Sequence, residues 1–211
     1  EFLDEIIPFA NKEEASVYEH LKRAIQFSLD HLGPHGMPAG LYADWNDCLR
    51  LGKNGESSFV AMQFYYAISI LKKLAESKED TDYIRYLDNK LSQMEKLIQT
   101  LCWDGDRFIR GYTEAGERIG AAADPEANMW LNPQSWAVIS GLASCQQANA
   151  AMNNVYERLN TSYGALLMDP PYHAHSFDGA LAVIYNQGAK ENSGIFSQSQ
   201  GWLILAEAMC G

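Results

Sequence analysis

The sequence predicts an all-α fold in which about six helices follow one another as antiparallel hairpins, with long loops between alternate helices. Three observations predict it. Apolar residues recur at helical spacing along most of the chain, one short run is β-prone, and no linker divides the 211 residues. Hydrophobic residues make up 47% and charged residues 20%, so residues 1–211 can bury a substantial core as a single domain.

The first three helices are predicted in the N-terminal half. From Glu13 to Leu32, apolar residues follow the i, i+3, i+4, i+7 spacing of one helix face, and Gly33-Pro34 ends the pattern. A second helix, Glu56–Glu76, is apolar almost all round, which predicts neighbours on more than one side. A third, about Thr81 to Cys102, carries one apolar stripe opposite a charged face.

The middle of the chain changes pattern. Trp103–Tyr112 combines turn residues with a β-prone run, which predicts a small hairpin or an irregular loop, and Ala121–Met129 is expected to be a loop. A fourth helix is predicted with Asn132 as its N-cap and Pro133 at its first position, running through Leu142.

The C-terminal third contains two further helices, at about Gln147 to Leu159 and about Ser193 to Met209. Between them, Leu166–Gln187 shows little periodicity, and loops of this length are usually functional or disordered. We therefore expect helical hairpins packed side by side, as in part of an α/α toroid.

Charge and composition exclude several classes of function. The chain has 16 basic and 27 acidic residues, a net charge of −11, so it repels phosphate backbones and we expect no nucleic-acid partner. Wholly apolar runs such as Leu203–Ala206 are far shorter than the roughly 20 residues that span a bilayer, so we expect no membrane partner. The N-terminus lacks the basic and apolar regions of a signal peptide, so we expect a chain that begins mid-protein or after processing.

The cysteines and histidines predict no metal site. The four cysteines lie far apart, without a Cys-x-x-Cys pair, and are expected to be buried reduced thiols in a cytoplasmic protein. His173 and His175 are two residues apart, a spacing that suits neither a helical zinc pair nor a catalytic triad. No Gly-x-Ser-x-Gly elbow, P-loop or dinucleotide fingerprint is present.

The segment Asp44-Trp45-Asn46-Asp47 has the composition of a sugar-binding site. An indole offers an apolar face to the C–H groups of a pyranose ring, while carboxylates and amides bind vicinal hydroxyls. The alternative is an Asx-rich turn in which Trp45 fills part of the core.

Four more clusters stand out. Lys53–Ser58 precedes a helix that Ser57 or Ser58 could simply cap. Asn132–Trp136 again places amides and an indole at a helix start, and Asp169–Tyr172 lies in the long loop. Tyr185–Gly194 is a polar loop before the last helix, whose N-terminus could receive an anion beside Lys190, or could be a solvated loop.

In combination and in order, these clusters resemble glycoside hydrolase family 94, the inverting phosphorylases of β-linked glucosides. The resemblance covers nearly the whole chain. Its elements are Asp44–Asp47, Gly52–Ser57, Gln134–Gly141, Pro170–Tyr172 and Lys190–Gly194.

The resemblance implies that residues 1–211 form the C-terminal half of an (α/α)6 catalytic barrel, a fragment of a larger enzyme that is expected to be a homodimer. It assigns the general acid to Asp47 and the non-reducing sugar to Trp45. Tyr185 and Lys190 would line the acceptor site. The expected substrate-binding set is completed by Asp44, Asn46, Gln134 and Glu191.

The implied reaction is phosphorolysis of a β-linked glucosyl disaccharide or oligosaccharide to α-glucose 1-phosphate and a shortened sugar, with phosphate as co-substrate and no cofactor. Phosphate arrives already nucleophilic, so the reaction needs a general acid but no general base. Asp47 must then hold a proton near neutral pH, and a neighbouring Asp44 carboxylate and partial burial are the expected causes.

The chain departs from the family pattern at Gln198, which stands where family members carry a phosphate-binding His. Glutamine can donate a hydrogen bond to phosphate but carries no charge. The resemblance further implies that a Thr-Gly phosphate site lies beyond Gly211 and a donor-site Arg and Asp before Glu1. The isolated chain is therefore expected to be inactive. Two alternatives stay open: an inverting hydrolase that uses water, and a non-catalytic carbohydrate-binding domain.

Overall fold

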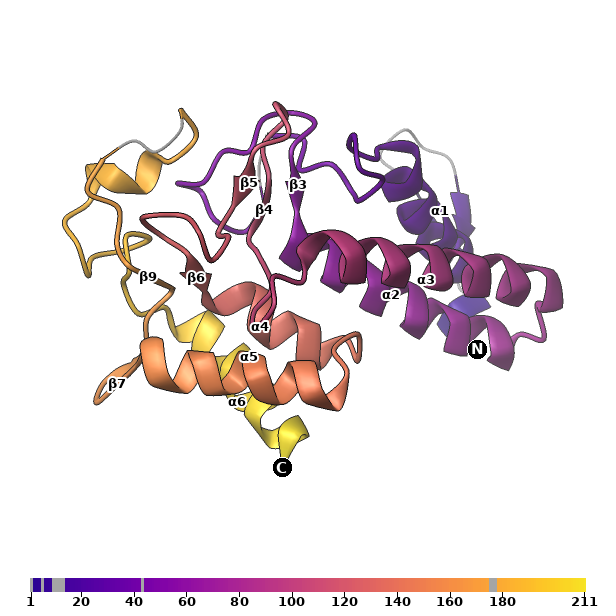
Figure 1. Cartoon of the computed structure of the whole chain (residues 1–211). Helices are drawn as coiled ribbons and strands as arrows, with labels where there is room; N and C mark the ends of the chain where they lie inside the picture. The colour runs from indigo at the N-terminus through magenta and orange to yellow at the C-terminus, as the bar shows by residue number, and fades with distance from the viewer. Residues whose placement is uncertain (1, 5, 9–13, 43, 175–177) are drawn as a thin grey trace.

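The computed structural model describes residues 2–4, 6–8, 14–42, 44–174 and 178–211. Within them, six α-helices are joined by loops that carry short strands and two 3-10 turns (Figure 1). The helices are α1 (Val17–Asp30), α2 (Ser58–Ser77), α3 (Thr81–Cys102), α4 (Leu131–Ile139), α5 (Cys145–Arg158) and α6 (Ser197–Cys210).

The prediction of a largely helical fold is confirmed, but the loops are more ordered than the sequence indicated. Their strands are two or three residues long and all pair antiparallel. β1 (Ile6–Pro8) pairs with β2 (Glu14–Ser16), β3 (Glu56–Ser57) with β4 (Gly111–Tyr112), β4 with β5 (Arg118–Ile119), β6 (Met129–Trp130) with β9 (Met168–Asp169), and β7 (Asn160–Thr161) with β8 (Gly164–Ala165).

Side-chain caps set where several helices begin. Ser16 accepts a hydrogen bond from the Glu19 N–H, so α1 starts at Val17, and the predicted start at Glu13 lies outside the described residues. Ser57 caps α2 through the Val60 N–H, as the capping alternative for the Lys53–Ser58 cluster proposed. The predicted bounds of α3, Thr81–Cys102, are confirmed.

The predicted start of the fourth helix is wrong. The N-cap of α4 is Trp130, whose side chain makes no capping hydrogen bond, and Asn132 and Pro133 lie inside the first turn. The pairing of β6 with β9 carries the chain directly into α4, so the backbone ladder rather than an Asn side chain decides where the helix begins. The helix ends at Ile139, before the predicted Leu142.

The long loop after β8 is also only partly irregular. It contains β9 and the 3-10 turn η2 (Leu181–Ile184), and α6 starts at Ser197, four residues later than predicted. The predicted hairpin after α3 is confirmed as a single bridge between Trp103 and Phe108. Gly105, at φ 87°, occupies its turn.

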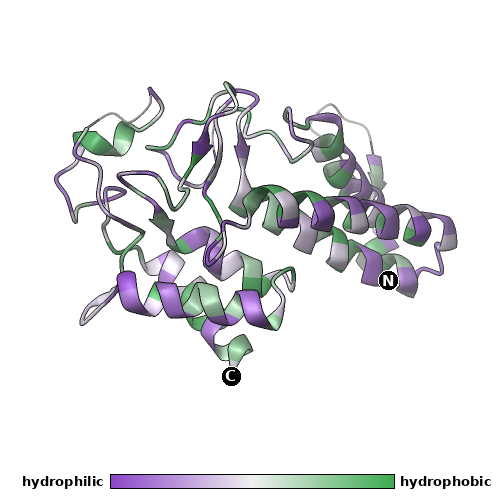
Figure 2. Cartoon of the chain, in the orientation of Figure 1, coloured by the Kyte–Doolittle hydropathy of each residue, from purple (hydrophilic) through white to green (hydrophobic). Residues whose placement is uncertain are grey.

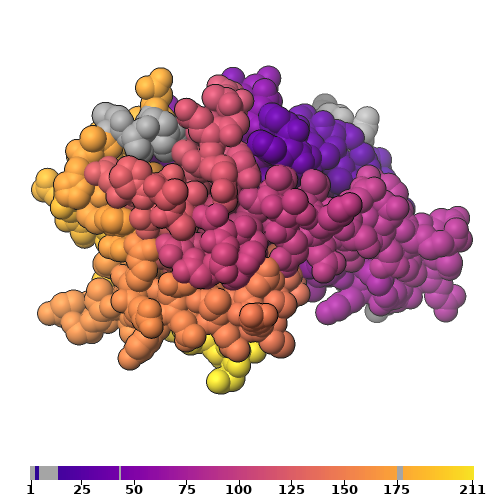
Figure 3. All heavy atoms as spheres, in the orientation of Figure 1, coloured from indigo at the N-terminus to yellow at the C-terminus, as the bar shows by residue number. Residues whose placement is uncertain are grey.

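The helices pack in two rows. α2 contacts α4 and α4 contacts α6, while α1 and α3 pack on α2 and α5 packs on α4 and α6. In Figure 3 the visible face is formed mainly by α3 and α5, and α6 shows only at the lower edge. Hydrophilic and hydrophobic residues alternate along α3 and α5 (Figure 2), as expected for helices with one face in water.

Aromatic side chains connect α2, α4 and α6. Trp202 of α6 lies 5.8 Å from Phe59 of α2 and 5.7 Å from Trp136 of α4, measured between ring centroids. A separate cluster of buried apolar residues, including Leu49, Leu167 and Ala180, lies under the loops between the helices. These loops are therefore packed against a core of their own, which allows them to hold side chains in fixed positions.

Candidate active site

Two loops that are distant in sequence form one layer. Leu49 forms a β-bridge with Ala180, the Arg50 N–H donates to the Gly179 carbonyl at 3.0 Å, and the Ala182 N–H donates to the Cys48 carbonyl at 3.1 Å. We name residues 44–50 the acid loop and residues 185–194 the polar loop. The bridge places both beside the same surface of the molecule.

Asp47 is exposed on the wall of a hollow of about 670 Å³. Its backbone N–H donates to Glu191 Oε1 at 2.9 Å, across 144 residues of sequence. Within the described residues its carboxylate forms no ion pair. The carboxyl group of Asp47 is therefore available to a molecule in the hollow, whose other lining residues are Tyr42, Asn46, Arg50 and Gly52.

Glu191 faces the acid loop. It is 8% exposed, and its Oε1 accepts the Asp47 N–H. Burial, followed by Glu191, raises the pKa of Cys48 to about 11. The sequence placed Glu191 in the substrate-binding set, and the structure places its carboxylate against the backbone of the loop that carries Asp47.

Asp44 is also turned away from the hollow. Its side chain is 3% exposed and forms an ion pair with Arg110, Oδ2 to Nη2, at 2.5 Å. Its other oxygen accepts the Asn46 N–H at 2.7 Å, so the Asx-turn alternative describes this residue correctly. The two causes expected to keep Asp47 protonated are not in place, because Arg110 neutralises Asp44 and the Asp47 side chain is exposed.

Trp45 and Asn46 are partly structural. The Trp45 ring packs edge-on against Phe196 and Trp202, and its indole N–H donates to Gln198 Oε1 at 2.6 Å. Asn46 is 1% exposed and accepts the Cys48 N–H, while its Nδ2 is buried without a protein partner in the described residues. The sequence did not anticipate the contact between Trp45 and Gln198, which brings the acid loop to the first turn of α6.

The polar loop is tied to the Pro-Pro-Tyr segment by Asn192. This fully buried amide accepts the Tyr172 N–H at 2.8 Å and donates to the carbonyls of Tyr172 and Tyr185 at 3.0 and 2.9 Å. Lys190 is exposed, with its Nζ 5.0 Å from the centroid of the Tyr185 ring. Tyr185 and Lys190 thus lie side by side, while their role at an acceptor site stays a prediction.

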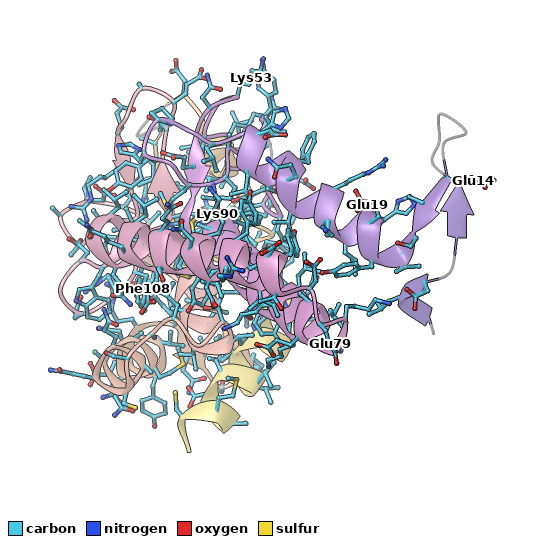
Figure 4. The ribbon with its side chains drawn as sticks, turned by 90° about the vertical axis from the view of Figure 1, so that its right-hand side faces the viewer. Glu14, Glu19, Lys53, Glu79, Lys90 and Phe108 are labelled. Atoms are coloured by element: carbon cyan, nitrogen blue, oxygen red, sulfur yellow. The ribbon has the colours of Figure 1, made fainter. Side chains whose placement is uncertain are left out.

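Gln134 does not line the hollow. It is fully buried, and its amide accepts the Phe108 N–H and donates to the Phe108 carbonyl, both at 2.8 Å. Because Gln134 is 0% exposed, the structure offers no surface of this side chain for the predicted contact with substrate. Figure 4 labels Phe108, which lies beneath the ribbon of α3.

Sequence reasoning missed Arg50, Tyr42 and Arg110. Arg50 follows the acidic motif by three residues and adds an exposed cation to the hollow, while Tyr42 adds an exposed ring. Arg110 lies in the short β-prone run and carries no motif that links it to Asp44. The backbone conformation of Tyr42 marks it, because its φ is 81°. Leu41 next to it, and Lys190 and Ser193 in the polar loop, also have positive φ. Such strained residues concentrate at functional sites.

No group of three or more His, Cys, Asp or Glu side chains in the described residues could hold a metal ion. His173 is exposed and pairs with Glu126, and His175 lies outside the described residues. None of the helices described is both long and apolar enough to cross a bilayer. The four cysteines are free, but only Cys48 and Cys102 are buried, while Cys210 is half-buried and Cys145 is exposed.

Comparison with known families shows the family to which the chain belongs. Residues 1–211 match the family described as "Glycosyl hydrolase 94 superfamily, catalytic domain". The chain belongs to this family. The resemblance found in the five sequence clusters is thereby confirmed.

The relatives that match along the whole chain include two named phosphorylases. N,N'-diacetylchitobiose phosphorylase of Vibrio furnissii is 37% identical, and the match covers 100% of this chain and 26% of that protein. Solabiose phosphorylase of Paenibacillus borealis is 29% identical, covering 100% of this chain and 28% of that protein. The chain thus spans about a quarter of the length of these relatives.

Among solved structures, a GH78 family rhamnosidase of Bacillus sp. GL1 matches with a TM-score of 0.54 at 13% identity. The match covers 66% of this chain and 14% of the rhamnosidase chain. At this identity the likeness concerns the fold alone.

Proposed function

We propose that the protein that contains this chain phosphorolyses a β-linked disaccharide or oligosaccharide, with a glucosyl donor, to α-glucose 1-phosphate and a shortened sugar. The observation that carries the proposal is the position of Asp47, an unpaired carboxyl group on the wall of a hollow, in a family 94 chain. The names of its relatives support phosphorolysis of a sugar.

In the proposed reaction, a phosphate oxygen attacks the anomeric carbon from the face opposite the departing sugar. The bond between the anomeric carbon and the glycosidic oxygen breaks, and the proton of Asp47 passes to that oxygen, so the configuration inverts. A sugar that covers Asp47 would remove water from it, and desolvation favours the neutral carboxyl group. A bound sugar would therefore supply the burial that the exposed Asp47 carboxyl group lacks.

The residues around Asp47 are assigned roles that fit their positions. Trp45 and Asn46 would shape the wall against the donor sugar, and Tyr185 with Lys190 would contact the acceptor. Gln198 presents its exposed Nε2 in the first turn of α6, where helix N–H groups favour an anion, and we assign phosphate to this end of α6.

We further propose that residues 1–211 form one domain, the C-terminal half of an (α/α)6 barrel. The succession α2, α4, α6 would form an inner row, and α1, α3 and α5 an outer row. The remaining helices of the barrel would supply donor-site residues, and the full-length enzyme would be a homodimer. In this arrangement the loops at one end of the inner helices converge on Asp47.

An inverting hydrolase is the second candidate, and one observation favours it. Gln198 carries no charge, so it offers phosphate less attraction than a protonated histidine would. A hydrolase would release free sugar without phosphate. A non-catalytic domain would bind sugar without product.

The test is an assay of the natural full-length protein on cellobiose, laminaribiose and N,N'-diacetylchitobiose, with and without phosphate. We expect a sugar 1-phosphate from at least one of them, formed only with phosphate. Replacing the acid by Asp47→Asn should lower kcat about 10³-fold, because a general acid contributes roughly 10²–10⁴-fold.

The matched control is Asp82→Asn, which alters an exposed carboxylate on α3 and should retain the full rate. Circular dichroism should show both variants folded. Wild-type turnover by Asp47→Asn would remove Asp47 from the mechanism, and free sugar formed without phosphate would replace phosphorolysis with hydrolysis.

A further inference from the structure

Arg110 is a fully buried arginine that lies behind the acid loop. Its guanidinium donates through Nη2 to Asp44 at 2.5 Å and through Nη1 to the Ser57 hydroxyl at 2.8 Å. It lies 5.3 Å from the centroids of both the Phe59 and the Trp130 rings. The charged group is thus enclosed by one carboxylate, one hydroxyl and two aromatic rings.

The backbone around Arg110 leaves it little freedom. Its N–H donates to the Ile119 carbonyl at 2.8 Å, and its own carbonyl accepts the Ser58 N–H at 3.1 Å. A side chain at Gly120 would come within 2.8 Å of the Arg110 Cβ, so only glycine fits beside it. The guanidinium therefore stands at a fixed point relative to α2 and β5.

This fixed point is connected to Asp47 by a short chain of bonds. Asp44 uses one oxygen for Arg110 and the other for the Asn46 N–H, at 2.7 Å, which closes the turn immediately before Asp47. On the other side, Glu191 holds the Asp47 N–H itself. A buried carboxylate without its cation is costly, so Asp44 keeps this place only while Arg110 is present.

We propose that Arg110 is a positioning residue for Asp47: by fixing Asp44 in the turn, it sets the place of the acid loop on the wall of the hollow. The catalytic part of this proposal rests on the proposed function, and the structural part does not. Arg110 does not line the hollow, and in this proposal it acts only through Asp44.

The test uses the natural full-length protein with Arg110→Met and Arg110→Lys. Phosphorolysis of a disaccharide needs a proton on the leaving oxygen, whereas a 2,4-dinitrophenyl β-glycoside of the same donor sugar needs almost none. A displaced acid should lower kcat for the disaccharide by roughly 100-fold, and kcat for the activated glycoside by less than about 10-fold. Arg110→Lys keeps the charge but lacks the planar guanidinium with its two donor nitrogens. Its kcat for the disaccharide should fall between those of wild type and Arg110→Met.

Hydrogen exchange supplies a readout that needs no activity. The amides of residues 46–50 should exchange at least about 10-fold faster in Arg110→Met, while those of α3 keep the wild-type rate. The double variant Asp44→Asn with Arg110→Met removes the unpaired buried charge and should still show fast exchange in this loop. It covers the case in which Arg110→Met alone fails to fold.

The control is Arg118→Met. It removes a more exposed arginine of β5 from its ion pair with Asp104 and should change neither readout. Equal losses on both substrates, with faster exchange throughout the molecule, would reduce Arg110 to a stability residue and overturn the proposal. Unchanged exchange in the acid loop would overturn it as well. If wild type shows no phosphorolysis but the loop loosens selectively, the proposed function fails while the positioning role stands.

Discussion

Three carboxylates of the two site loops lie in three different environments. Asp44 is buried against Arg110, Glu191 is buried against the backbone of the acid loop, and Asp47 is exposed on the hollow. Both oxygens of Asp44 and Oε1 of Glu191 accept hydrogen bonds from the protein, so these two side chains position other groups. Asp47 alone among them is available to react, which is why the geometry favours it as the acid.

The reactivity of the Cys48 thiol can be used to test this arrangement of Glu191 and the acid loop. Burial raises the pKa of Cys48 to about 11 and that of Cys102 to about 12, because a thiolate is disfavoured in an apolar environment. At pH 8 the thiolate fraction of Cys48 is roughly 10⁻³. We expect iodoacetamide to modify the exposed Cys145 first, with Cys48 and Cys102 protected, as measured by mass spectrometry.

In Glu191→Gln the carboxylate charge next to Cys48 is removed, so the pKa of this thiol should fall toward its ordinary value and its alkylation should speed up. Burial is the larger cause, so part of the protection should remain. Cys102, whose raised pKa owes nothing to Glu191, is the internal control. An unchanged Cys48 rate would mean that Glu191 does not lie against this thiol in solution.

At the scale of elements, α4 and α6 use the same device to hold a neighbouring loop. Gln134 of α4 binds the N–H and the carbonyl of Phe108, and Gln200 of α6 binds those of Ala165, at 2.8 and 2.9 Å. Each glutamine is followed two residues later by a tryptophan, Trp136 or Trp202, and these rings contact each other. Both helices also start at an aromatic N-cap without a capping bond. The glutamine therefore fixes the position of each helix start by tying it to a loop.

This device predicts unequal costs for two matched substitutions. Gln134→Met keeps the size of the side chain but leaves the buried N–H and carbonyl of Phe108 unpaired, which should lower the free energy of unfolding by about 2–4 kcal/mol. Gln200→Met should cost less, because Gln200 is half-buried and part of its side chain is already in contact with water, whereas Gln134 is fully buried.

Urea unfolding of both variants, followed by tryptophan fluorescence, checks the prediction. Equal stability of Gln134→Met and wild type would show that the Phe108 contacts contribute nothing net. A larger loss in Gln200→Met than in Gln134→Met would contradict the role assigned to burial.

At the scale of the whole molecule, the helices leave apolar side chains uncovered. α6 exposes Ile204, Leu205 and Met209, at 69%, 48% and 53%. α2 exposes Tyr66 and Ile70. Exposed apolar residues gathered on one helix, as on α6, are typical of an association site. In the proposed barrel, further helices would cover it.

The 211-residue chain by itself should therefore self-associate through α6. Replacing Ile204 and Leu205 together by lysine should shift it toward monomer, because two charges cannot be buried in an apolar contact. Sedimentation velocity over a range of concentrations measures the effect. Tyr156→Lys on α5 is the control, since this ring is also 69% exposed but lies on another helix. Association that persists in the double variant, or that Tyr156→Lys abolishes, would exclude α6 as the contact.

Helix content and the identity of the site loops could be predicted because both depend on local order. The amphipathic stripe of α3 and the Ser57 cap of α2 are determined by neighbouring residues, and the prediction was correct for both. The start of α4 was predicted wrongly, because it depends on a strand pair between Met129–Trp130 and Met168–Asp169, which are distant in sequence. Glu191 and Gln134 were likewise recognised as important polar residues, but their hydrogen-bond partners within the chain could not be predicted from the sequence.

The sequence by itself determined the helical class, the family and the short list of polar residues, since these follow from periodicity and from motifs of adjacent residues. Only the tertiary structure decided which carboxylate stays available, because the environments of Asp44, Asp47 and Glu191 are made by residues up to 144 positions away. Pairing and burial in a folded chain depend on distance in space, and motif spacing along the sequence carries no information about Arg110.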